Sequence, residues 1–152
     1  MKEYEYSFKV DGLDKYIEYC QTNGYEFLEE TNQIRIIYRN TNKTIARLTT
    51  NIKSGAVTKK LDFKDDILSD SVLIERRESL PIEVSNDEVV ESILDFLNFK
   101  KDNTLKRIRT VYKKDNVTFE LDTYEAPEKT FVVAIEGEKE EVDKVYEEVM
   151  NI

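Results

Sequence analysis

The chain has 152 residues, of which 23 are basic and 32 acidic, giving a formal net charge of −9. This excess of negative charge opposes non-specific binding to phosphate backbones, so nucleic acid is not the expected partner. The absence of histidine excludes histidine metal sites, Ser-His-Asp triads and imidazole general bases, so any chemistry must use carboxylates, Lys and Arg side chains, or Tyr.

Length and patterning also bound the organisation of the chain. A length of 152 residues is typical of one domain, so a single domain is expected over residues 1–152. No apolar run approaches a membrane span, the N-terminus lacks a signal-peptide pattern, and the single cysteine, Cys20, lies in a helical stretch. These features predict a soluble, cytoplasmic protein with no membrane partner, as a monomer or a homodimer.

The first predicted element is a strand in the opening MKEYEYSFKV. Side chains alternate between the two faces of a strand, so one face carries only polar residues and the other only aromatic residues and Val. The polar face consists of Glu3, Glu5, Ser7 and Lys9.

Three helices are predicted along the chain. Asp11 or Asp14 is expected to cap the first, which runs to about Asn23 and stops at Gly24. Residues 85–88, Ser-Asn-Asp-Glu, form a capping box before a second helix that contains VVESILDFL. A third helix is expected over about residues 140 to 150, where apolar residues recur at helical spacing.

The segments between the helices are typical of strands, because they are short, rich in β-branched and aromatic residues, and separated by turn signals. They also repeat at an offset of 74 residues, which relates Arg35 to Arg109 and Tyr25 to Phe99. The repeat predicts two copies of a strand-helix-strand-strand-strand unit in one antiparallel sheet system. The expected strands are QIRIIYR, KTIARLTT, KKLDFK, DSVLIERRE, LKRIRTVYK, VTFELDTY and KTFVVAIEG.

Polar side chains share one face on seven of the predicted strands. An open sheet with a solvated outer face would account for any single pair. Taken together, the pairs favour a barrel whose lumen receives the charged side chains. The predicted fold class is therefore α+β, a closed or nearly closed antiparallel β-barrel of about eight strands, flanked by helices. The same-face sets are Glu3/Glu5/Ser7/Lys9, Arg35/Arg39, Arg47/Thr49, Asp62/Lys64, Arg76/Glu78, Arg107/Arg109 and Glu120/Asp122.

A lumen with both charge signs suits a polyanion bound together with a metal ion. Carboxylates bind Mg²⁺ or Mn²⁺ through oxygen, whereas Arg and Lys bind phosphate oxygens and offset charge on a transferred phosphoryl group. Cations alone would bind phosphate without activating water, and carboxylates alone would repel the substrate.

Six segments, in order, resemble the CYTH family of triphosphate tunnel enzymes, which includes thiamine triphosphatases, inorganic tripolyphosphatases and class IV adenylate cyclases. The likeness extends over nearly the whole chain and includes the two intervening helices. It implies a closed antiparallel barrel whose tunnel binds triphosphate, with glutamates on the metal and basic residues on the phosphates. The matching segments are Glu3-x-Glu5, Arg-Leu-Thr at 47–49, Leu-Asp-Phe-Lys-Asp at 61–65, Arg76-x-Glu78, Lys-Arg-Ile-Arg-Thr-Val-Tyr at 106–112 and Val-Ala-Ile-Glu at 133–136.

The resemblance implies roles for individual residues. Glu78 or Glu136 is the candidate to activate water, and Arg35, the repeat partner of Arg109, is left open between a solvent-facing and a site position. Metal ligands are expected at Glu3, Glu5 and Glu136, and phosphate ligands at Lys9, Arg47, Lys64, Arg76, Arg107 and Arg109.

Three positions depart from the family pattern. Ser7 stands where the opening motif has lysine, Thr49 where a second arginine is frequent, and Ala134 where a late glutamate pair begins. The lysine serves catalysis or phosphate binding in relatives, and Lys9 could replace it only if the substrate sits about 6 to 7 Å further along the strand.

Three functions are therefore weighed. The first is a metal-dependent phosphohydrolase acting on inorganic tripolyphosphate or on an organic triphosphate. The second is an adenylate cyclase, which needs a nucleoside pocket beside the tunnel, and no sequence motif for adenine recognition is found. The third is a non-catalytic module that binds triphosphate or polyphosphate, which the three departures favour.

Overall fold

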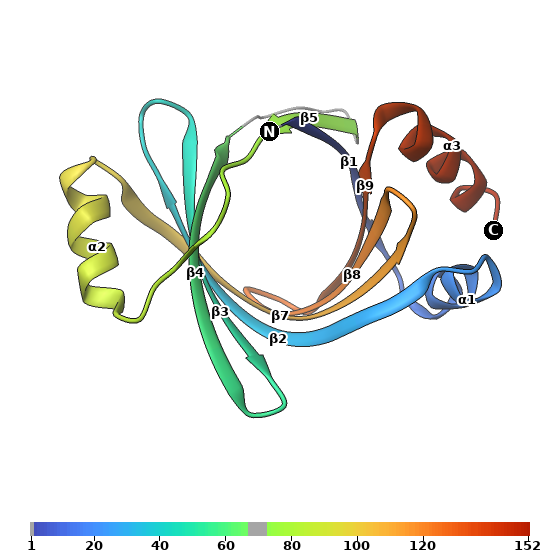
Figure 1. Cartoon of the computed structure of the whole chain (residues 1–152), viewed down its shortest axis with the longest axis horizontal. Coiled ribbons are helices and arrows are strands. Elements are labelled where there is room, and N and C mark those ends of the chain that lie inside the picture. The colour runs from blue at the N-terminus through green and yellow to red at the C-terminus, as the bar shows by residue number, and fades with distance from the viewer. Residues whose placement is uncertain (1, 67–72) are drawn as a thin grey trace.

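The computed structural model of the chain describes residues 2–66 and 73–152, with side chains described for residues 3–66 and 77–152. These residues form nine strands and three helices (Figure 1). In this described part, none of the helices has the length and apolar character needed to cross a membrane. The elements are β1 (Lys2–Val10), α1 (Asp14–Thr22), β2 (Glu26–Arg39), β3 (Thr44–Lys53), β4 (Ala56–Asp65), β5 (Leu73–Arg77), β6 (Ile82–Glu83), α2 (Asp87–Phe96), β7 (Lys100–Lys114), β8 (Val117–Ala126), β9 (Thr130–Gly137) and α3 (Lys139–Val149).

All nine strands belong to one antiparallel sheet, in the order β5-β1-β9-β8-β7-β2-β3-β4-β6. The sheet curls into a ring, so that β4 comes next to β5 (Figure 1). At this seam an isolated bridge joins Lys64 and Glu78, and the Ser79 backbone N–H donates to the Phe63 carbonyl at 2.8 Å. The described strands form no continuous ladder there. The barrel is nearly closed, as predicted.

The predicted internal repeat is confirmed in the order of elements. The first copy is β1-α1-β2-β3-β4 and the second is β6-α2-β7-β8-β9. The second copy begins with the two-residue strand β6, which the sequence did not predict. The longest strands, β2 and β7, pair with each other at the centre of the sheet, where Gln33 lies opposite Arg107 in register.

The helix ends follow the local sequence, with two corrections. The predicted capping box begins at Ser85, but the residue that caps α2 is Asn86, whose side-chain oxygen accepts from the backbone N–H groups of Glu88 at 2.9 Å and Val89 at 3.2 Å. The prediction that Asp11 or Asp14 caps α1 is wrong, since the N-cap is Leu13, which makes no side-chain cap bond.

The predicted stop after the first helix is confirmed at Gly24. Its φ of 79° lies in the left-handed region that glycine adopts without a steric cost. Asn98, at the equivalent place after α2, has a φ of 63°. Both helices therefore end in the same way.

The helices cover the outer face of the sheet in two places. Helices α1 and α3 lie together at one end of the molecule, and α2 lies at the other (Figure 1). Burying an apolar side chain as fully as Leu94 contributes about 1.5–3 kcal/mol, so both clusters hold the ring in shape. The buried cluster at the α1–α3 end includes Tyr16, Cys20, Phe119, Leu121, Val133, Ile135, Val142 and Val149, and the cluster under α2 includes Tyr38, Ala46, Leu48, Leu61, Val90, Leu94 and Phe99.

Candidate functional site

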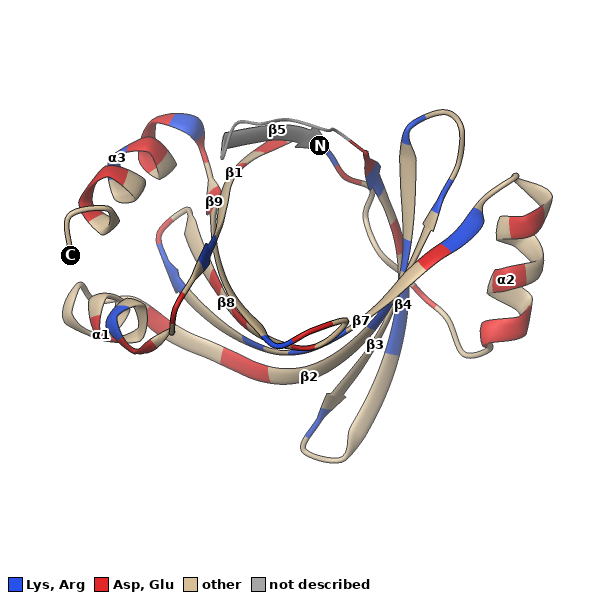
Figure 2. Cartoon of the chain, turned by 180° about the vertical axis from the view of Figure 1, so that it is seen from behind, with Lys and Arg blue, Asp and Glu red and all other residues tan. Residues whose placement is uncertain are grey.

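The inner face of the ring encloses a cavity of about 400 Å³. Sites for small ligands commonly measure about 300–1,000 Å³, so this cavity suits a compact ligand. Basic residues lie along β3 and β4, whereas α2 and α3 carry many of the acidic ones (Figure 2). The charged side chains that line the cavity are Arg35, Arg39, Arg47, Lys64, Arg107 and Arg109, together with Glu5, Glu78, Glu120, Asp122 and Glu136.

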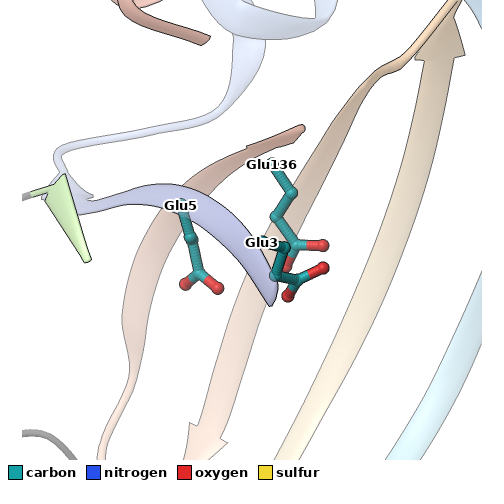
Figure 3. Close-up of side chains that lie close together, drawn as sticks. All are labelled: Glu3, Glu5 and Glu136. Carbon is teal, nitrogen blue, oxygen red and sulfur yellow. The ribbon is translucent and has the colours of Figure 1, made fainter. Parts of the chain in front are cut away.

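Three glutamates converge at one side of this interior. Glu3 and Glu5 project from the same face of β1, and Glu136 projects from β9 (Figure 3). Strands β1 and β9 pair with Glu5 directly opposite Glu136, which fixes their relative height. One carboxylate oxygen of each residue lies within 4.8 Å of one oxygen of the other two. The structure therefore brings together the three residues expected to bind metal.

The electrostatics of this cluster favour a cation. Burial, followed by repulsion from Glu78 and Glu5, raises the pKa of Glu3 to about 7. Burial and the neighbouring Glu120 raise the pKa of Glu136 strongly. The Glu3 Oε1 atom is buried and has no hydrogen-bond partner among the described residues. Crowded carboxylates with an unsatisfied oxygen fit a hard divalent cation such as Mg²⁺ or Mn²⁺.

Next to the glutamate cluster, the interior carries arginines, of which Arg109 is the most strongly paired. Its Nε and Nη2 atoms donate to the two carboxylate oxygens of Asp122, each at 2.8 Å, and its Nη1 donates to Glu120 at 2.7 Å. Although burial acts to raise the pKa of Glu120, Arg109 holds it well below its usual range. This bidentate geometry holds the guanidinium in one orientation.

Arg107 lies beside it and retains an unused donor. Its Nε donates to Gln33 Oε1 and its Nη1 to the Tyr124 hydroxyl, both at 2.7 Å. Its Nη2 is buried without a hydrogen-bond partner among the described residues. Asp122 Oδ2 lies 3.7 Å from its Nη1. Arg107 is thus held at two points while one N–H group remains available to a ligand.

Arg47 and Lys64 form the third basic group. Arg47 makes a bidentate pair with Asp62, with its Nε 2.9 Å from Oδ1 and its Nη2 bonded to Oδ2. Glu78 Oε1 lies 3.4 Å from Arg47 Nη2 and 3.6 Å from Lys64 Nζ. Glu78, a candidate to activate water, therefore faces the cavity between two cations.

Arg35 also lines the cavity, which answers the question left open by the sequence. Its Nε donates to the hydroxyl of Thr49 at 2.9 Å. Its partner is therefore a neutral oxygen, whereas Arg109, the equivalent residue of the second repeat, donates to the carboxylate of Asp122. Burial and the like charges of Arg107 and Arg109 lower its pKa well below the usual value. Arg35 is therefore an electrostatically strained cation inside the site.

The other predicted positions fall in different places. Ser7 and Ala134 both line the cavity and lie opposite each other in the β1–β9 register. Thr49 is buried and bonded to Arg35. Lys9 is exposed and lies outside the cavity lining, although β1 remains paired with β9 at this position. The side chain of Arg76 lies outside the described residues.

Several residues of the site were not assigned roles from the sequence. Arg35, Glu120 and Asp122 were recognised as same-face charges, but their contacts depend on which strands are neighbours. Gln33 and Tyr124 carried no signal of their own, although Gln33 stands 74 residues before Arg107 and could have been found from the repeat. All five touch or line the basic side of the cavity.

A second recess adjoins the cavity at the end near Lys9. It has a volume of about 440 Å³ and shares Ser7, Leu105, Tyr124 and Val132 with the cavity lining. Its remaining walls are Phe8, Lys9, Pro127, Glu128 and Thr130. The lining is mainly apolar, because Phe8, Leu105 and Val132, together with Pro127 and the Tyr124 ring, contribute most of it. A ligand with a charged part in the cavity can extend an apolar part into this recess.

Comparison with known sequences gives one clear relative. A protein of Methanocaldococcus jannaschii, named "Putative adenylate cyclase", is 28% identical over 163 aligned positions, which cover 100% of this chain and 87% of the relative. No family model matches the chain.

Solved structures show the same fold. The PH1012 protein of Pyrococcus horikoshii matches with a TM-score of 0.77 and 24% identity, covering 98% of this chain and 88% of that protein. The Mimivirus capping-enzyme triphosphatase matches with a TM-score of 0.62 and 11% identity, covering 99% of this chain and 87% of that protein. At these identities the likeness concerns the fold. The name of the relative and this shared fold agree with the resemblance to the CYTH family.

Proposed function

We propose that the protein is a metal-dependent phosphohydrolase that acts on a triphosphate held in the barrel lumen. One observation carries the proposal. The carboxylate oxygens of Glu3, Glu5 and Glu136 lie close enough together to bind one metal ion, and buried arginines face the same ring interior. The names of the sequence relative and of the structural neighbour, an adenylate cyclase and a triphosphatase, support phosphate chemistry in general.

The basic side of the lumen would bind the phosphate chain. The unpartnered Nη2 of Arg107 offers a donor to a phosphate oxygen. Arg35 would gain a counter-charge that it lacks at Thr49, and Lys64 and Arg47 would add charge at the side of Glu78. Phosphate oxygens would compete with the existing carboxylate partners, so binding depends on the metal to offset the added negative charge.

The acidic side would hold the metal through Glu3, Glu5 and Glu136. A bound Mg²⁺ or Mn²⁺ would neutralise charge on phosphate oxygens and favour formation of a nucleophilic water. Attack of water on a terminal phosphorus breaks one bridging P–O bond, so tripolyphosphate yields phosphate and pyrophosphate. Glu78 or Glu136 would accept the proton that the attacking water loses.

Two alternatives have specific support. A small Ser at position 7 and Ala at position 134 leave the middle of the β1–β9 wall uncharged, which favours a module that binds polyphosphate without hydrolysis. The apolar recess of about 440 Å³ offers a place for the nucleoside of ATP, which an adenylate cyclase requires.

The test is a matrix of metals and substrates. Tripolyphosphate, thiamine triphosphate and ATP are each incubated with Mg²⁺ or Mn²⁺, and phosphate, pyrophosphate and cyclic AMP are measured separately. Metal-dependent release of phosphate supports the proposal, whereas cyclic AMP with pyrophosphate selects the cyclase.

Binding is measured in the same samples from thermal unfolding. A ligand at 100 times its dissociation constant stabilises the folded state by about 2.7 kcal/mol. Stabilisation without any product selects the non-catalytic module. If no triphosphate with metal shifts the unfolding temperature or yields product, the proposed site is wrong.

A further inference from the structure

Helices α1 and α2 occupy equivalent places in the two repeats but have different surroundings. At the offset of 74 residues, the buried Tyr16 and Cys20 of α1 correspond to the buried Val90 and Leu94 of α2. In the first repeat, α3 covers the side of α1 that the sheet leaves free. Tyr19 makes this contact, donating its hydroxyl to Glu148 of α3 at 2.6 Å.

In the second repeat the equivalent side of α2 faces solvent. Ile93, at the position equivalent to Tyr19, is 52% exposed, and Phe96 is 90% exposed. With Val89 at 56% and Leu97 at 52%, these residues recur at helical spacing and form one stripe, called here the α2 apolar face. Single exposed apolar residues are common, but a continuous stripe marks a binding surface.

The position of α2 is well fixed, so this face is not produced by a loosely packed helix. The Tyr38 hydroxyl bonds to Glu91 at 3.2 Å, and Lys59 Nζ lies 2.8 Å from Asp87. Val90 and Leu94 are almost completely buried against the sheet. Figure 1 shows α2 alone at its end of the molecule, far from α1 and α3.

We propose that a second copy of the chain covers the α2 apolar face, through antiparallel pairing of α2 with its counterpart across a two-fold axis. Helix α3 of a second copy is not available for this role, since Val142, Tyr146 and Val149 already pack against its own barrel. A two-fold pairing of α2 needs no other surface, because the same stripe serves both chains.

Charge complementarity supports the antiparallel direction. The helix begins with acidic residues that include Glu88, and Lys100 and Lys101 follow its end. Antiparallel pairing brings the acidic start of each helix toward the lysines of the other chain. Lys100 is available for such a contact, since its partner Asp95 lies 3.6 Å away and both side chains are more than three-quarters exposed.

The test is the oligomeric state of the full chain, measured by sedimentation equilibrium over a range of concentrations. The wild type should form a dimer, and Ile93→Glu and Phe96→Glu should each weaken it at least about tenfold, as expected for central interface residues. Leu28→Glu is the matched control, because Leu28 is 45% exposed near the start of β2, which follows α1 at the other end of the molecule. It should leave the dimer unchanged.

A charge exchange tests the direction of pairing. Lys100→Glu should weaken the dimer several-fold, and adding Glu88→Lys should restore it. Circular dichroism and thermal unfolding of each variant verify that the fold is intact. A wild type that stays monomeric at all concentrations, or a dimer that survives both Ile93→Glu and Phe96→Glu, overturns the proposal. Failure of the second exchange to restore the dimer overturns the antiparallel arrangement.

Discussion

The two repeats build the same half-barrel but differ in charge at several equivalent positions that face its interior. Arg35 opposes Thr49 in β2–β3, as Arg109 opposes Asp122 in β7–β8. Two residues away on these strands, Arg47 of the first repeat corresponds to Glu120 of the second. On the next strands, Asp62 lies opposite Arg47 and Ala134 lies opposite Glu120, so Asp62 and Ala134 are equivalent. Two residues further along, Lys64 is therefore equivalent to Glu136.

The difference shows how a repeated fold acquires a polar site. The strand order and register supply equivalent inward positions in both halves, and the residue type at each position then decides its role. Cations on β3 and β4 suit phosphate, and carboxylates on β8 and β9, with those of β1, suit metal. The site therefore depends on unlike residues at matching positions rather than on an added structure.

Arg109 and Arg35 should differ most in their effect on stability. Arg109→Met should destabilise the fold by about 3–5 kcal/mol, because it removes the cation that bonds directly to the buried Asp122 and to Glu120, whereas Arg107 lies 3.7 Å from Asp122. Arg35→Met should change stability by less than about 1 kcal/mol, since it removes a cation that burial and its neighbours already disfavour. Urea unfolding of both variants measures the contrast, and equal losses would show that the two positions are energetically alike.

Glu136 is the carboxylate that occupies the place of Lys64 in the second repeat, and replacing it with an amide should weaken metal binding. Glu136→Gln should lower Mn²⁺ affinity and metal-dependent turnover about 100-fold, equivalent to about 2.7 kcal/mol. Without metal the variant should be about as stable as the wild type, because the raised pKa of Glu136 keeps it protonated beside Glu120 and an amide can donate the same hydrogen bond. Calorimetric titration and unfolding provide both readouts.

Glu18→Gln serves as the control for this loss, because Glu18 lies exposed on α1. It should leave Mn²⁺ affinity unchanged. Undiminished affinity in Glu136→Gln would contradict the assignment of the glutamate cluster as the metal site.

Ser7 offers a way to add a cation to the acidic wall. Ser7→Lys should raise turnover about tenfold, which requires only about 1.4 kcal/mol of added transition-state stabilisation. The small Ala134 opposite Ser7 leaves room for the longer side chain. Steady-state kinetics compare Ser7→Lys with the uncharged Ser7→Met, and Glu5→Gln in the Ser7→Lys background should remove the gain. A slower Ser7→Lys enzyme would show that Ser7 is not a defect.

The helix caps provide the smallest contrast between the halves. Asn86→Ala should destabilise the fold by about 1 kcal/mol, whereas Asn86→Gly should cost only a few tenths, because glycine is a tolerated cap. A substitution at Leu13, the N-cap of α1, should cause no comparable loss of stability, because its side chain makes no cap bond. Thermal unfolding measures both variants. An unchanged stability in Asn86→Ala would mean that the contacts of α2 with the sheet hold the helix without the cap.

The sequence predicted the architecture and the location of the site because both depend on local periodicity. Alternation along one strand was enough to place Glu3 and Glu5 on one face, and the repeat was enough to relate Arg35 to Arg109. The partner of each charge could not be predicted, since the pairing of Arg109 with Asp122 depends on the register set by the hairpin between β7 and β8. Lys9 was assigned to the phosphates from alternation along β1, and since it lies outside the cavity lining this role stays a prediction.

The pairing of Gln33 with Arg107 shows what two-fold symmetry forbids at its own axis. These residues are 74 positions apart, and they face each other where β2 meets β7, so they are the same position of the two copies. If both copies carried the same residue there, it would meet itself, and two arginines would repel each other. Because the copies differ at this position, one residue donates and the other accepts, and the guanidinium of Arg107 is held in one orientation between the two halves of the barrel.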